Sequence, residues 1–94
     1  MPVPLSGKKT VTTAGTAVPL GSQQVNAALM VKALAANTGL IYLGNDGAGD
    51  VASTNGLELS AKESVVFELV SNLANIMLDS AVNGEGVTWL NLSA

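Results

Sequence analysis

The sequence contains no cysteine and no histidine. Without cysteine the chain can form neither a disulfide framework nor a thiolate nucleophile, and without histidine it lacks the commonest general base and metal ligand. Most familiar catalytic arrangements are thereby excluded. We therefore expect a protein that is not an enzyme and that holds no metal ion or other cofactor.

Charged residues are scarce, at 12% of the chain, against about 25% in an average soluble domain. The positive charges are four lysines with no arginine, and the net charge is −3. Such a chain has no basic patch that could neutralise a phosphate backbone, so nucleic acid is not an expected partner. A chain that is 48% hydrophobic has a largely neutral surface, which suits burial in an assembly.

Long hydrophobic runs are also lacking. The longest uncharged stretch, residues 10–31, is long enough to span a bilayer, but Pro19, two glycines and several amide side chains interrupt it. At the N-terminus the lysines follow the apolar residues, which is the reverse of a signal peptide. We expect no membrane partner and a protein made and used without secretion.

The chain has the length of one domain. Pro2, Pro4 and Gly7 deny regular structure to its beginning. We therefore expect an extended N-terminal arm over residues 1–7 and a single folded domain over residues 8–94.

The domain contains about eight short segments typical of β strands, with glycine or asparagine at nearly every break between them. This spacing predicts an all-β fold, an antiparallel sandwich or jelly roll with little or no helix. Pro19 lacks an N–H group and predicts that the second strand lies at a sheet edge or forms a bulge. The predicted strands are residues 8–13, 16–20, 25–35, 40–43, 57–59, 64–70, 76–82 and 87–92.

Residues 25–35 are the one segment in which a helix competes, because alanine and leucine are frequent there. The break Asn37-Thr38-Gly39 and the clear strand that follows it favour a hairpin instead.

The clearest predicted hairpin joins the last two strands. Asn83-Gly84 is the residue pair favoured in a type I′ turn, and a two-residue turn there sets Leu78 opposite Trp89. We expect structural roles for Asn83, Gly84 and Trp89, with Trp89 buried. Asp79 interrupts an apolar run, and a buried carboxylate needs partners. We expect Asp79 to be structural too, bonded to turn amides near this hairpin or to a neighbouring subunit.

Several polar residues invite chemical interpretations that the pattern does not favour. Asn45, Asp46 and Asp50 are oxygen donors of the kind that calcium prefers, but the loop 45–56 lacks the alternation of an EF-hand and its bidentate glutamate. No lysine follows the glycines of this loop, so a phosphate site is disfavoured. Strand alternation gives no reason for any two acidic residues to share a catalytic cleft. The acidic candidates are Glu58, Glu63, Glu68, Asp79 and Glu85.

Three apolar side chains are candidates for contact with a partner. Val3 and Leu5 give the arm apolar groups that a purely solubilising tail does not need. Tyr42 lies in the apolar run 40–43, which lacks strict alternation, so that one side of this strand is expected to meet the core and the other a neighbouring subunit.

Four segments, VTTAGTAVPL, LIYLGNDG, NGLELSAKESV and SAVNGEGVTWLNL, together resemble small structural proteins of tailed-bacteriophage virions. The resemblance covers residues 8–92. It implies a jelly-roll or sandwich subunit without enzymatic activity, often a homotrimer, that attaches to the major capsid protein.

The function implied is that of a capsid decoration or cement protein on the outer surface of the virion, assembled in the host cytoplasm. The alternative is a fibre or tail module that binds glycan on the host surface. In that case Trp89, Tyr42 and the loop 45–56 would form the glycan site, since aromatic faces stack on sugar rings.

Overall fold

The computed structural model describes residues 6–25, 28–45, 51–52, 55–68 and 72–91. The described chain is all-β, as predicted, with one short 3₁₀ helix, η1, at Leu73–Asn75. No helix among these residues is long and apolar enough to cross a membrane. The strands are β1 (Ser6–Thr10), β2 (Val18–Pro19), β3 (Leu29–Ala33), β4 (Ile41–Gly44), β5 (Leu57–Leu59), β6 (Ser64–Phe67), β7 (Met77–Ser80) and β8 (Gly86–Asn91).

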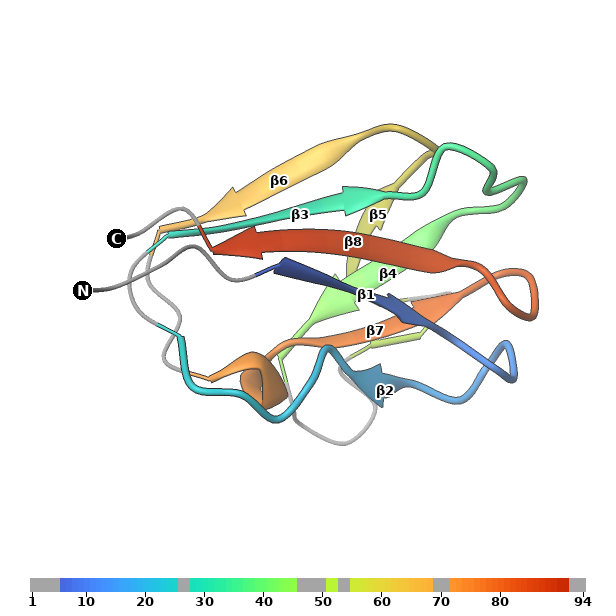
Figure 1. The fold of residues 1–94 in the computed structure, drawn as a ribbon. Coiled ribbons are helices and arrows are strands. Elements are labelled where there is room, and N and C mark those ends of the chain that lie inside the picture. The colour runs from blue at the N-terminus through green and yellow to red at the C-terminus, as the bar shows by residue number, and fades with distance from the viewer. Residues whose placement is uncertain (1–5, 26–27, 46–50, 53–54, 69–71, 92–94) are drawn as a thin grey trace.

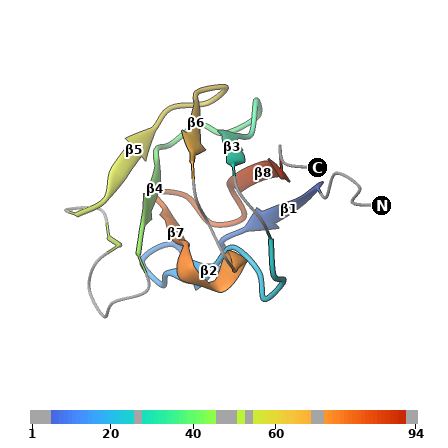
Figure 2. The same cartoon turned by 90° about the vertical axis from the view of Figure 1, so that its left-hand side faces the viewer.

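The strands form two four-stranded antiparallel sheets, with orders β1-β8-β3-β6 and β2-β7-β4-β5 (Figure 1). Figure 2 shows these sheets as two facing layers. If the chain is pictured as one long hairpin that folds over on itself, its paired strands are β1·β8, β2·β7, β3·β6 and β4·β5, and these are the pairs found in the two sheets. This is the topology of an eight-stranded jelly roll. Among the described strands, only β4 and β5 are both consecutive and paired.

The core between the sheets follows from alternation along the strands. On β3, Leu29, Val31 and Ala33 are buried whereas Met30 and Lys32 point outward, because successive side chains of a strand face opposite sides of the sheet. The fully buried core side chains with the largest volumes include Leu29, Ile41, Leu43, Leu73, Leu78, Val11, Val31 and Val87.

The predicted hairpin around Asn83-Gly84 is wrong. β7 lies in the second sheet and β8 in the first, so Trp89 pairs with Gly7 of β1 and Val31 of β3 rather than with Leu78. Of the two turn residues only Gly84 has a positive φ, +83°, whereas a type I′ turn needs one at both. The turn is instead held by the Gly84 N–H group, which donates to the carbonyl of Val11 at 2.7 Å.

The predicted hairpin from residues 25–35 to 40–43 is wrong for the same reason. β3 is a strand and not a helix, but β3 pairs with β6 and β8 while β4 pairs with β5 and β7. The connection 34–40 therefore crosses from one sheet to the other. Pro19 lies on β2, which is an edge strand as expected.

The first strand begins earlier than the boundary predicted between the arm and the domain. Ser6 and Gly7 belong to β1, where they pair with Leu90 and Trp89. Gly7 leaves room for the indole, since a Cβ atom at this position would lie 2.7 Å from Cζ2 of Trp89. The remainder of the predicted arm, Val3 and Leu5 included, lies outside the described residues.

Candidate functional site

The outward side of the β1-β8-β3-β6 sheet, which we call the open face, carries an exposed apolar row. Strand register places Leu90 of β8 between Ser6 of β1 and Met30 of β3, and Met30 beside Val66 of β6. Leu90 and Val66 are 39% and 45% exposed, and Met30 is partly exposed. Because neighbouring strands lie about 4.8 Å apart, these side chains form one continuous stripe across the sheet.

A second row crosses the same face two residues further along each strand. Lys8 pairs with Thr88, Thr88 with Lys32, and Lys32 with Ser64. Both lysines are exposed. These two lysines are the only charged residues in the two rows, so the apolar row is bordered by positive charge on this side.

Most acidic residues of the described chain lie away from these two rows. Glu58 is on β5 of the second sheet, and Glu63 lies before β6, where its Oε1 accepts a hydrogen bond from the N–H group of Ser60 at 2.7 Å. Glu68 directly follows β6, two residues beyond Val66 and past the apolar row from the lysines, and Glu85 precedes β8. The two rows of the open face therefore carry positive charge on a chain whose net charge is −3, and Glu68 is the acidic residue of the described chain that lies nearest in sequence to the apolar row.

The outward side of the β2-β7-β4-β5 sheet, which we call the covered face, differs. Register places Tyr42 between Asp79 and Glu58, yet Asp79 is only 2% exposed. Oδ1 of Asp79 accepts hydrogen bonds from the N–H groups of Gly15 at 3.0 Å and Ser80 at 2.8 Å. Asp79 thus binds one turn amide, that of Gly15, which lies in the β1–β2 connection rather than near the predicted C-terminal hairpin, and one amide of its own strand, that of Ser80.

The two large polar aromatic side chains are both buried. Tyr42 is 7% exposed on a central strand of its sheet, and Trp89 is 9% exposed with its indole over Gly7. Burial of Tyr42 argues against the prediction that it contacts a partner, because its own chain covers the ring. Because both Tyr42 and Trp89 are buried, neither ring is available to stack on glycan as the fibre or tail alternative expected. Asp46 and Asp50 of the loop 45–56 lie outside the described residues.

Three connections between the sheets are tied together at one end of the sandwich. Oε2 of Glu85 accepts hydrogen bonds from the N–H group and Oγ1 of Thr38, at 2.7 and 2.9 Å, and Oε1 accepts from the N–H group of Gly39 at 3.0 Å. The hydrogen bonds from the Gly39 and Thr38 amides lower the pKa of Glu85 below its ordinary value, since they favour the charged carboxylate. Oδ1 of Asn83 accepts a hydrogen bond from the N–H group of Ala14 at 2.7 Å.

Asn37 reinforces this end of the molecule. Its Nδ2 donates to the carbonyl of Gly86 at 2.9 Å, and its Oδ1 accepts from the N–H group of Gly86 at 3.4 Å. In the sequence, Asn37 is only part of a predicted break between strands, and Glu85 is only one of several scattered acidic residues. No local signal marks these contacts, because the partners lie 46 to 49 residues away in the chain.

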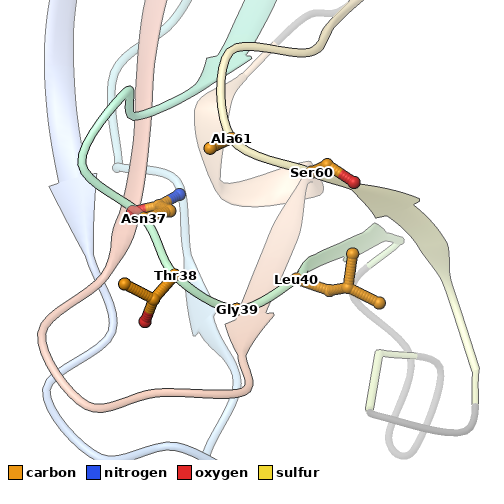
Figure 3. A pocket seen from close by; sticks show the side chains of 6 residues that line it. All are labelled: Asn37, Thr38, Gly39, Leu40, Ser60 and Ala61. Carbon is orange, nitrogen blue, oxygen red and sulfur yellow. The ribbon is translucent and has the colours of Figure 1, made fainter.

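A hollow of about 330 Å³ lies beside this end of the sandwich (Figure 3). Its lining contains no acidic or basic side chain, and the amide of Asn37 is already bonded to Gly86. Ser60 supplies a hydroxyl group without a base beside it in the lining. The lining residues are Asn37, Thr38, Gly39, Leu40, Ser60 and Ala61.

No group of three acidic side chains within the described ranges is placed to hold a metal ion. The open face is the part of the described structure that combines a row of exposed apolar side chains with exposed charge. The sequence does not mark Met30 or Leu90 of this face, but the apolar run 65–67 of β6 lacks strict alternation and so indicates an apolar side chain on the outward side as well as in the core. Comparison of the chain with protein-family models, curated proteins and solved structures found no match.

Proposed function

We propose that the chain is a structural protein of a bacteriophage virion, a decoration or cement protein that binds the major capsid protein on the outside of the shell. The observation that carries this proposal is the open face, on which an apolar row, Leu90, Met30 and Val66, stays exposed beside two lysines. Exposed apolar patches with a polar rim are typical of protein contact surfaces. The jelly-roll fold and the sequence resemblance to virion proteins give further support.

The mechanism is stabilisation by binding. A protein that binds the assembled shell, and not the separated subunits, shifts the equilibrium toward the shell. For one site, a free concentration one hundred times the Kd contributes about 2.7 kcal/mol. Many copies on one capsid add their contributions.

We also propose that the chain acts as a homotrimer on the virion surface and that it is assembled with the particle in the host cytoplasm. The trimer rests on the resemblance. A trimer that engages three capsid sites at once gains avidity without new contacts. This gain suits a small domain whose single docking face offers limited area.

The fibre or tail alternative loses its main support. The two rings expected to stack on sugar, Tyr42 and Trp89, are 7% and 9% exposed. We advance no second candidate function.

The test uses capsids assembled without this chain. The purified protein is mixed with them, bound protein is measured by sedimentation, and the melting temperature of the shell is recorded. We expect saturable binding and a higher melting temperature, with light scattering giving the mass of a trimer for the free protein. Absence of binding at concentrations well above those in an infected cell contradicts the proposal.

A further inference from the structure

We propose that the open face is the docking surface of this protein, and that its partner is a protein surface with an apolar centre bordered by carboxylates. This inference rests on the proposed function and specifies which side of the molecule meets the capsid and what chemistry it meets there.

The exposed apolar side chains of the open face are contiguous. Four large apolar side chains of the described chain are notably exposed, and two of them, Val66 and Leu90, share one row with Met30 between them. The other two stand apart, Leu57 on edge strand β5 and Val82 in the connection before β8. Single exposed apolar residues are ordinary on protein surfaces, whereas a continuous row marks a contact.

The two lysines of the open face are complementary to a partner surface that carries negative charge. Lys8 and Lys32 stand on strands that flank β8, about 10 Å apart, and each lies about 7 Å along its strand from the apolar row. Desolvating two ammonium groups in a contact is costly unless anionic groups meet them. A partner that fits this face therefore places carboxylates opposite the lysines and apolar side chains opposite Met30.

A second copy of the chain does not meet this requirement. Its open face carries the same two lysines, neither row contains a carboxylate, and the acidic residue nearest in sequence to the apolar row is Glu68, just after β6. Two identical faces would bury four ammonium groups with two Glu68 carboxylates, one from each copy, to meet them. The charge pattern therefore favours a different protein as the occupant.

The charge arm of the test compares reversals of the two lysines on the open face with reversal of one lysine outside its two rows. The double variant Lys8→Glu/Lys32→Glu is compared with Lys62→Glu, which reverses an exposed lysine in the turn before β6. We expect binding of undecorated capsids to weaken at least tenfold for the double variant and to stay within about twofold for the control. Raising salt from about 0.05 to about 0.5 M should weaken wild-type binding more than that of Lys8→Gln/Lys32→Gln.

The apolar arm uses Val66→Thr and Leu90→Thr, since threonine keeps a high β propensity. The matched control is Leu57→Thr, because Leu57 is 48% exposed but lies on the other sheet. Circular dichroism and thermal melting establish that each variant is folded. We expect at least a tenfold loss of capsid affinity for the Val66→Thr/Leu90→Thr double variant and no loss for Leu57→Thr.

The outcomes separate this inference from the function on which it rests. If the wild-type protein does not bind capsids, the proposed function is overturned and the inference with it. If the wild-type protein binds and the folded open-face variants bind equally well, the inference alone is overturned. If these variants bind capsids normally but turn a wild-type oligomer into monomers, a second copy occupies the face, which also overturns it.

Discussion

Each outer face of the sandwich is one side of a four-stranded antiparallel sheet, but the two faces differ in how far their central side chains are exposed to solvent. On the covered face, Asp79 and Tyr42 are 2% and 7% exposed. The N–H group of Gly15, in the β1–β2 connection, donates a hydrogen bond to the carboxylate of Asp79. On the open face, Val66 and Leu90 remain 45% and 39% exposed.

The difference separates residues that the fold requires from residues that it leaves available. A buried carboxylate with its hydrogen bonds satisfied stabilises the folded state. Its loss leaves the N–H groups that donated to it without an acceptor. An exposed apolar side chain gains little from folding and is available to a partner. Substitutions on the covered face should therefore reduce stability, and those on the open face should reduce binding.

The largest expected effect belongs to the core between the faces. Trp89→Ala removes the indole that packs over Gly7 and is only 9% exposed. We expect a loss of about 3–5 kcal/mol in the free energy of unfolding, measured by denaturant titration. Trp89→Phe is the control and should lose less. A loss below about 1 kcal/mol for Trp89→Ala would contradict the buried position, as would the fluorescence of a fully solvated indole in the wild-type protein.

The next largest effect tests the covered face. Asp79→Ala leaves the N–H groups of Gly15 and Ser80 without their acceptor. We expect a loss of about 1–3 kcal/mol, measured by the same titration. Asp79→Asn keeps an oxygen acceptor and should lose less. A stability unchanged in Asp79→Ala would show that the β1–β2 connection does not depend on this carboxylate.

The pH dependence of stability tests the end of the sandwich that both sheets share. The amides of Gly39 and Thr38 lower the pKa of Glu85 in the folded state. Its contribution is therefore fully present above the ordinary glutamate pKa, 4.5, and is lost as the pH falls through the lower, folded value. We expect the wild-type protein to melt above Glu85→Gln at neutral pH. This difference should shrink as the pH falls below 4.5. A difference that does not change with pH would rule out the carboxylate as its source.

The smallest expected change in stability is on the open face. Val66→Thr and Leu90→Thr alter exposed side chains, so each should change the free energy of unfolding by no more than about 0.5 kcal/mol. Thermal melting of the two variants beside the wild-type protein measures this. A large destabilisation would mean that the apolar row is part of the fold and would erase the contrast between the faces.

The all-β class and the number of strands were predictable because they depend on local patterns. Glycine or asparagine stands at nearly every break between the short β-prone segments, and Pro19 marks an edge strand through its missing N–H group. The resulting preferences exist in the chain before any strand has a partner.

Sheet membership was not predictable, because it depends on contacts between distant segments. Asn83-Gly84 correctly marks a turn but does not determine whether the strands on either side pair with each other. Gly7 reads as a flexible arm residue until Trp89, far along the chain, is placed against it. The same holds for the candidate site, whose apolar row takes one residue from each of three strands that are separated in sequence.

Cryo-electron microscopy of the intact particle that contains this chain tests the central claim most directly. We expect jelly-roll density on the outside of the capsid, with the outward side of β1, β8, β3 and β6 against the major capsid protein and carboxylates of that protein near Lys8 and Lys32. Density for this chain in the tail or a fibre, or on the capsid with that sheet face turned to solvent, would contradict the account.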